Sequence, residues 1–303
     1  MKEYAFGIDL GGTTAKIGLF TTSGALLEKW EVATDTSNAG EHILENLAAA
    51  VLGKMKEKSI QPEQVEGVGI GVPGPVLDSS IVPIVCANLG GWGERNVSAQ
   101  LSGLLDGLKV LVGHDAHVAA LGEIWMGAAK GAKNAVMVTL GTGVGGGVVV
   151  NGKVIDGVHG AGGEIGHITV NRHETAVCGC GKRGCLEAYC SAWRISDDLG
   201  IPLSEFFAGV ERHVPEYETM WHDLLRHLAI GVNNIRMVLD CDVVLGGFLT
   251  QYLPPYMPLL KEYVAAGNPF EPSADYLHLS VMRRHTVPLG VALHFIQEFI
   301  ETI

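Results

Sequence analysis

The chain has 303 residues, which is room for about two domains of roughly 150 residues each. With 47% hydrophobic and 18% charged residues it can build a full core, so the composition excludes an intrinsically disordered protein. The net charge of −12 disfavours nucleic acid and anionic membranes as partners, and any phosphate must be bound locally by backbone amides or a metal ion. The 41 glycines gather in short clusters between apolar runs, which indicates many tight turns.

We expect neither a targeting segment nor a membrane span. Residues 1–12 do not fit a signal peptide, because a polar motif already begins at Asp9. Residues 134–152 are uncharged, but their glycines and asparagines are typical of strand–turn–strand rather than of a spanning helix. The expected location is the cytoplasm, where the six cysteines are reduced and a cysteine cluster indicates metal binding rather than disulfides.

The first part of the chain reads as an α/β unit that opens with a hairpin, because two apolar runs are joined by Gly11-Gly12. Asp115 stands where the N-cap of an alanine-rich helix is expected. The predicted elements in chain order are strands Tyr4–Asp9 and Thr14–Phe20, a helix over 40–58, strands Val65–Val72 and Lys109–Val112, and a helix over Ala116–Ala129.

The same pattern then restarts, which is a weak internal repeat of architecture. The predicted elements are strand Ala135–Leu140, a glycine turn over 141–147, strand Val148–Val150, a helix over Trp221–Leu239, strand Asp242–Leu245 followed by Gly246-Gly247, and an amphipathic segment over Pro288–Ile303. We interpret the chain as two α/β halves in close contact, with a break near residue 116.

The chain contains neither a dinucleotide-binding fingerprint in its required strand–turn–helix setting nor a P-loop. The two GxGxxG matches, at Gly69 and at Gly141, are not followed by a helix as a dinucleotide fingerprint requires, and there is no P-loop sequence. The turns within Asp9–Thr14 and Leu140–Gly147 remain. Their glycines allow backbone N–H groups to converge on an anion, and Asp9 can hold Mg²⁺ through water. Either turn by itself can be an ordinary hairpin turn. Because one such turn opens each half of the chain, the pair favours a site in which a phosphate group is held between the two halves.

The strongest chemical signal is His167 followed by Cys178, Cys180 and Cys185. One imidazole and three thiolates suit tetrahedral Zn²⁺, and four protein ligands make the site structural. Buried free thiols or a disulfide are the alternatives. Glu164 and Glu187 lie close to this segment and, like Asp115, can bind sugar hydroxyls, although Asp115 can be only a helix cap and Glu187 only a surface residue.

These motifs together resemble the ROK family of sugar kinases and repressors, most closely its glucokinase branch. The matching segments are Asp9–Thr14, Gly71–Pro75, Asn88-Leu89, Asp115-Ala116, Leu140–Gly147, Gly163–His167 and Cys178–Glu187. The resemblance implies an actin-like, ribonuclease-H-like fold of two α/β domains with the nucleotide and sugar cleft between them. It implies a domain 1–116, joined by the C-terminal helix at about 289–303, and a domain 117–288 with a zinc loop over 167–187.

The resemblance also implies an ATP-dependent hexose kinase that phosphorylates glucose at the 6-hydroxyl and uses Mg²⁺ and a structural Zn²⁺. Asp115 would be the general base. The matching sugar-binding positions are Asn88, His114, Asp115, Glu164, His167 and Glu187. The matching MgATP positions are Asp9, Gly11, Gly12, Thr13, Thr14, Lys16, Gly141, Thr142, Gly143, Gly246 and Gly247. The zinc ligands would be His167, Cys178, Cys180 and Cys185.

The sequence departs from the family at His114 and His117, where asparagine usually stands immediately before and two residues after the catalytic aspartate. This leaves the hexose open, with N-acetylmannosamine, mannose, fructose and allose as alternatives to glucose. A protonated His114 would lower the pKa of the base, so activity is expected to fall on acidification. Alternatively, His114 packs against the following helix.

The family also contains sugar-responsive repressors, which carry a helix-turn-helix domain before the first glycine turn. Only eight residues precede Asp9, so we expect an enzyme rather than a DNA-binding or non-catalytic sugar-sensing protein. The expected assembly is a homodimer or homotetramer. The motifs leave open whether ATP or polyphosphate is the phosphate donor.

Overall fold

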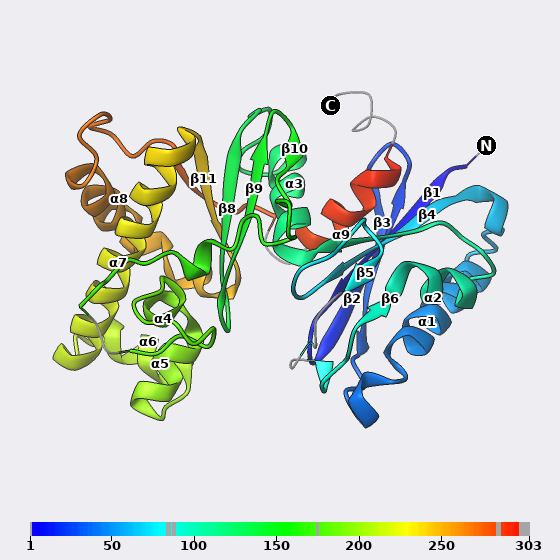
Figure 1. Cartoon of the computed structure of the whole chain (residues 1–303), viewed down its shortest axis with the longest axis horizontal. Coiled ribbons are helices and arrows are strands. Elements are labelled where there is room, and N and C mark those ends of the chain that lie inside the picture. The colour runs from blue at the N-terminus through cyan, green and yellow to red at the C-terminus, as the bar shows by residue number, and fades with distance from the viewer. Residues whose placement is uncertain (1, 83–85, 87–88, 174–175, 283–285, 297–303) are drawn as a thin grey trace.

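A computed structural model describes residues 2–82, 86, 89–173, 176–282 and 286–296. Two five-stranded mixed sheets lie apart, one from each part of the chain, with helices α3 (Asp115–Met126) and α9 (Thr286–Ala292) between them (Figure 1). Asn88 and the last seven residues of the predicted amphipathic segment lie outside the described residues.

The first sheet has the strand order β3-β2-β1-β4-β7, with bounds β1 Tyr4–Leu10, β2 Thr14–Thr21, β3 Leu26–Ala33, β4 Val65–Val72 and β7 Val110–His114. β1 pairs antiparallel with β2, which confirms the predicted hairpin, and parallel with β4. Phe6, Ile8 and Leu10 alternate toward the core formed with α1 (Ile43–Glu57) and α2 (Val97–Leu104). The intervening Gly7 faces the opposite side of the sheet, where a Cβ atom at this position would collide with Pro288 O. A two-stranded ribbon, β5 Ile81–Val82 and β6 Arg95–Asn96, stands apart from this sheet.

The second sheet repeats this plan in the order β10-β9-β8-β11-β12, with bounds β8 Ala135–Leu140, β9 Val144–Val150, β10 Lys153–Val154, β11 Asp242–Gly246 and β12 Leu277–Leu279. Again the first strand pairs antiparallel with the second and parallel with the fourth. The repeat predicted from the two strand–glycine–strand patterns is therefore confirmed in the topology. The second core includes helices α4 Glu187–Cys190, α5 Ala192–Leu199, α6 Leu203–Glu211, α7 Pro215–Leu239 and α8 Met257–Ala266.

The predicted turn over 141–147 is too long. Only residues 141–143 form the turn, and the last three glycines belong to β9, where a Cβ atom at Gly146 would clash with Ile165 and one at Gly147 would clash with α3. A Cβ atom at Gly147 would lie 2.3 Å from Ala116 O. The helix predicted from Trp221 begins earlier, at Pro215, which suits the first turn of a helix.

A third apolar cluster joins the two sheets through α3 (Asp115–Met126) and α9 (Thr286–Ala292). α9 packs on β1 and β4 as well as on α3, so it contacts the first sheet from the side opposite to α1. Residue 116, where a break was expected, lies in the first turn of α3, and the division into domains 1–116 and 117–288 stays a prediction. None of the helices within the described ranges is both long and apolar enough to cross a membrane.

Candidate active site

Asp115 lies where several elements converge. It follows β7 directly and is the first residue of α3. A Cβ atom at Gly71, near the end of β4, would lie 3.6 Å from Asp115 Cα and 2.6 Å from Val287 Cγ1 of α9. The next residue, Ala116, packs on β9 of the second sheet. The carboxyl group is thereby held at the junction of both sheets.

The environment of Asp115 favours its neutral form. Although 38% of the side chain is exposed, protein surrounds the rest, and this burial, reinforced by repulsion from Asp9 and Glu164, raises the pKa to about 7. The backbone N–H of Ala116 donates to Oδ1 at 2.6 Å and opposes part of this shift, as does His117. A carboxyl group with a pKa near neutrality is suited to accept a proton at physiological pH.

His114 does not behave as expected from its position beside the base. Its Nε2 lies 3.3 Å from Asp115 Oδ1, its ring contacts His117 at 4.6 Å between centroids, and only 10% of its side chain is exposed. Burial, together with the neighbouring His117, lowers the pKa of His114 to about 4. The imidazole is therefore neutral near pH 7, and the expectation that its charge would depress the pKa of Asp115 on mild acidification is wrong.

His117, in the first turn of α3, joins that helix to the loop between β10 and Glu164. Its Nδ1 lies 3.0 Å from Asp156 Oδ1 and its Nε2 lies 2.7 Å from the carbonyl oxygen of Gly162. Each ring nitrogen thus lies within hydrogen-bonding distance of an oxygen atom of this loop. The helix that begins at Asp115 and the loop that leads to Glu164 are thus connected through one buried side chain.

The β1–β2 turn brings most of the predicted phosphate residues of the first half together. Asp9 Oδ2 accepts a hydrogen bond from Lys16 Nζ at 3.1 Å across the hairpin. Thr34 Oγ1 donates to Gly11 O, and Thr34 N donates to Thr13 O, which fixes the turn against β3. A Cβ atom at Gly11 would lie 2.9 Å from Thr14 O, so the turn requires a glycine there.

The β8–β9 turn is the counterpart in the second sheet. Gly141 N donates to Gly143 O at 2.9 Å, which closes the turn around Thr142. Gly246 and Gly247, at the end of the neighbouring β11, lie against β8, where a Cβ atom at Gly247 would approach Leu140 O to 2.4 Å. The structure therefore groups Gly141, Thr142 and Gly143 with Gly246 and Gly247.

The four predicted metal ligands come together. Ligand atoms of His167, Cys178, Cys180 and Cys185 all lie within 4.8 Å of one another. His167 Nδ1 lies 3.6 Å from Cys178 Sγ, and Cys180 Sγ lies 3.8 Å from Cys185 Sγ. Tetrahedral zinc with bonds of about 2.3 Å to sulfur separates two thiolates by about 3.8 Å, so this group fits the ion. A hydrogen bond from the backbone of Lys182 lowers the pKa of Cys180, which favours its thiolate.

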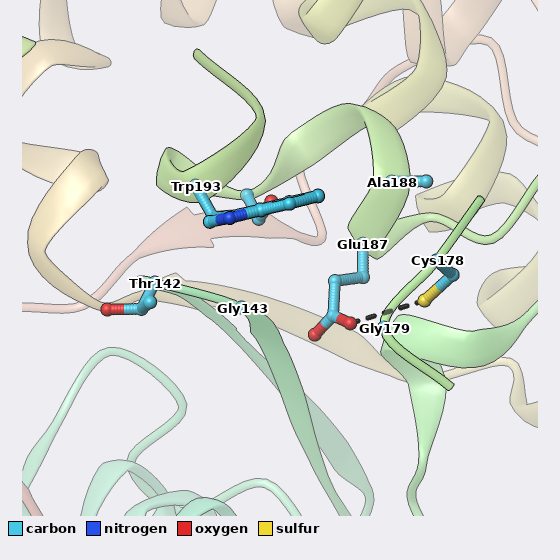
Figure 2. Close-up of a pocket in the computed structure, with 8 residues that line it drawn as sticks. Thr142, Gly143, Cys178, Gly179, Glu187, Ala188 and Trp193 are labelled. Carbon is cyan, nitrogen blue, oxygen red and sulfur yellow. Dashed lines mark hydrogen bonds between the residues drawn. The ribbon is translucent and has the colours of Figure 1, made fainter. Parts of the chain in front are cut away.

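The carboxylates next to the metal group are arranged differently from each other. Glu164 Oε2 lies 3.9 Å from His167 Nε2, the ring nitrogen that does not face Cys178. Glu187 instead accepts hydrogen bonds from Val144 N at 2.9 Å and from Cys178 Sγ at 3.3 Å (Figure 2). Glu187 therefore links the cysteine loop to the β8–β9 turn, and it lines a pocket of about 210 Å³ together with Thr142 and Gly143.

Sequence reasoning missed two residues of this region. Asp156 lies 39 residues from its partner His117, and no local pattern marks that pairing. Trp193 lines the same pocket as Thr142, and an exposed tryptophan after a cysteine loop has no distinctive spacing.

Comparison with known proteins relates the chain to sugar kinases. Residues 5–282 match the ROK family. A glucokinase of Halalkalibacterium halodurans is 42% identical over 191 residues, which cover 63% of this chain and 57% of that protein. The match thus spans less than two thirds of that relative's length. An N-acetylmannosamine kinase of Escherichia fergusonii is 31% identical over 293 residues, covering 94% of this chain and 96% of that protein.

Two solved structures share the whole architecture. The ROK hexokinase from Thermus thermophilus has a TM-score of 0.83 and 30% identity, with 99% of each chain covered. A ROK family glucokinase from Streptomyces griseus, solved in complex with glucose and AMPPNP, has a TM-score of 0.77 and 26% identity over 95% of this chain and 98% of that one. The expected actin-like α/β fold is confirmed, and the chain belongs to the ROK family.

Proposed function

We propose that the protein is an ATP-dependent hexose kinase that transfers the γ-phosphoryl group to the 6-hydroxyl of glucose, with Asp115 as the general base. The observation that carries this proposal is the position of Asp115 at the junction of the two sheets, with a pKa raised to about 7. A carboxylate near this pKa is ionised in a large fraction of molecules at neutral pH and is still basic enough to accept the hydroxyl proton.

In the proposed reaction the oxygen of the 6-hydroxyl attacks the γ-phosphorus while the bond from that phosphorus to the β–γ bridging oxygen breaks. Asp115 takes the hydroxyl proton, and ADP leaves with the electron pair of the broken bond. Amides of the β1–β2 and β8–β9 turns stabilise the charge on the phosphates, which is the main contribution that a protein makes to phosphoryl transfer. Lys16, held by Asp9, adds a positive charge at the first turn.

Two metal ions belong to this proposal. Asp9 would hold Mg²⁺ through water, and the ion would neutralise phosphate charge. His167, Cys178, Cys180 and Cys185 would hold a structural Zn²⁺, whose role is to fix Glu164 and Glu187 relative to the β8–β9 turn. The hydrogen bond that Glu187 accepts from Val144 N, and the position of Glu187 two residues after Cys185, support such a mechanical link.

The choice of glucose is supported by the glucokinase relative, and N-acetylmannosamine is the main alternative because a kinase for that sugar matches nearly the whole chain. His114 is the residue of this chain that bears on the choice. An asparagine amide offers two donors and one acceptor, whereas a neutral imidazole offers one of each, so a sugar hydroxyl at this position meets a different hydrogen-bonding partner.

A coupled assay for ADP release tests the proposal. Purified protein would be assayed with MgATP and a panel containing glucose, mannose, fructose, allose and N-acetylmannosamine, with phosphorus NMR to identify the phosphorylated oxygen. The highest kcat/KM is expected for glucose, with the product carrying phosphate at O6. A clear preference for N-acetylmannosamine would make that sugar, and not glucose, the assigned substrate. If no sugar of the panel were phosphorylated, the kinase assignment would be rejected.

A further inference from the structure

Trp193 is an exposed apolar side chain that lies beside a pocket. It is 47% exposed, yet it lines the pocket of about 210 Å³ that also contains Thr142, Gly143 and Glu187. Figure 2 shows the indole lying across this pocket, with the Thr142–Gly143 turn on one side and Glu187 and Cys178 farther along. Single exposed apolar residues are common on protein surfaces, but this one faces a pocket shared with the phosphate turn.

Hydrogen bonds hold the backbone at Trp193 against that turn. Trp193 N donates to Thr142 O at 3.2 Å, and Ala192 N donates to Gly141 O at 2.8 Å. Ser191 caps the same helix, α5, by accepting a hydrogen bond from Arg194 N. The backbone of Trp193 is therefore already ordered beside the turn, so a flat ligand that stacks on the indole does not have to order this segment.

A second exposed aromatic ring lies at the other end of the same turn. Phe248 is 46% exposed and follows Gly246-Gly247 directly. A Cβ atom at Gly141 would lie 3.9 Å from two carbon atoms of its ring. The two aromatic residues thus adjoin Gly141 and Thr142, the residues assigned above to the phosphates.

We propose that the indole of Trp193, assisted by Phe248, binds the base of the nucleotide by stacking, and that these residues make the enzyme select a nucleoside triphosphate over polyphosphate. This inference rests on the proposed function, because it takes the β8–β9 turn as the site of the phosphates. Polyphosphate has no ring to stack, so the aromatic side chains contribute affinity to a nucleotide alone. Stacking of a base on an aromatic side chain is sequence-tolerant, since every base presents a flat face.

The test compares nucleotide and inorganic ligands on the same variants. Binding of a non-hydrolysable ATP analogue and of inorganic tripolyphosphate, both with Mg²⁺, would be measured by calorimetry for wild type, Trp193→Ala and Trp193→Phe. In Trp193→Ala the Kd of the analogue is expected to rise about 5- to 100-fold, while the Kd of tripolyphosphate stays unchanged. Trp193→Phe should recover part of the affinity, and Phe248→Ala should weaken the analogue in the same direction.

Controls separate this effect from a general loss of structure. Phe270→Ala removes a ring that is 83% exposed and lies between α8 and β12, so it should leave both dissociation constants unchanged. The analogue should quench tryptophan fluorescence in wild type more than in Trp193→Phe. Unchanged analogue affinity in Trp193→Ala, an equal loss for tripolyphosphate, or no binding of the analogue to wild type would overturn the inference. Binding that depends on Trp193 without turnover of any sugar would reject the kinase assignment alone.

Discussion

At the scale of single residues, the catalytic role proposed for Asp115 conflicts with its contribution to stability. Replacing it with asparagine keeps the shape and removes the base. We expect Asp115→Asn to lower kcat by about 10²- to 10⁴-fold, the range typical of a positioned general base, while sugar binding measured by calorimetry is retained. Turnover close to the wild-type rate would mean that Asp115 only begins the helix.

The same variant should be more stable than wild type at neutral and alkaline pH. In the folded protein the pKa of Asp115 is raised to about 7, above its ordinary value of 3.8. The stability that its neutral form contributes is fully present below the ordinary value and is lost as the pH rises through about 7. The melting temperature of Asp115→Asn minus that of wild type should therefore increase between about pH 4 and about pH 8. A difference that is constant across this range would contradict the raised pKa.

The wild-type pH profile of kcat/KM for the sugar follows from the same shift. Because the ionised carboxylate of Asp115 accepts the proton in the proposed reaction, kcat/KM should rise with pH and level off above about pH 7. His114 should not add a step in this range, since its pKa is lowered to about 4. The profile of His114→Asn would show this: a midpoint unchanged from wild type agrees with a neutral His114, and a shifted midpoint does not.

His117 offers a second residue-scale prediction, because asparagine is too short to reach both Asp156 and the carbonyl of Gly162. We expect His117→Asn to loosen the loop before Glu164 and to lower kcat/KM for the sugar by about tenfold, equivalent to roughly 1.4 kcal/mol, without changing the KM for ATP. Asp156→Ala keeps the Gly162 contact and should have a smaller effect. Equal losses for sugar and ATP in His117→Asn would indicate a general disturbance instead.

At the scale of elements, the loop of His167 and the three cysteines is expected to act on the site from outside it. Metal analysis of the purified protein should give about one Zn²⁺ per chain. Cys180→Ala should lose most of the metal and much of the activity, although Cys180 is exposed and is not among the residues assigned to the substrate. Cys241→Ala removes a buried thiol from the residue just before β11 and should retain the metal. Fully active protein without zinc would rule out this role.

The elements were largely predictable from the sequence because their signals are local. Gly11-Gly12 between apolar runs predicted the first hairpin, and the spacing of three cysteines and a histidine predicted a group that the structure brings together. The extent of β9 was not predictable, since Gly147 is required by the approach of α3 and not by a turn. Asp156, which contacts His117, and Val144, which donates to Glu187, each lie about 40 residues from their partner in sequence, and no periodic pattern predicts such pairings.

At the scale of the whole molecule, the relation between the two sheets depends on the contact of α3 with α9. A Cβ atom at Gly290 of α9 would lie 1.7 Å from Val118 O of α3, so the two helices touch through their backbones. α9 also contacts β1 at Gly7 and β4 at Gly69. Any displacement of α9 is therefore transmitted to the first sheet and to Asp115 at the start of α3.

Two identical substitutions should consequently have opposite effects. In Gly290→Ala the added methyl group collides with the backbone of α3, which is expected to lower the free energy of unfolding by about 1–3 kcal/mol. The melting temperature and kcat should both fall. Gly53→Ala, in the exposed part of α1, meets no atom within 4 Å in the described structure and should stabilise the protein by roughly 0.5–1 kcal/mol through helix propensity, with unchanged kinetics. Thermal unfolding and steady-state assays of both variants provide the comparison. If Gly290→Ala unfolded no earlier than Gly53→Ala, the close contact of α3 and α9 would not be what holds the two halves in register.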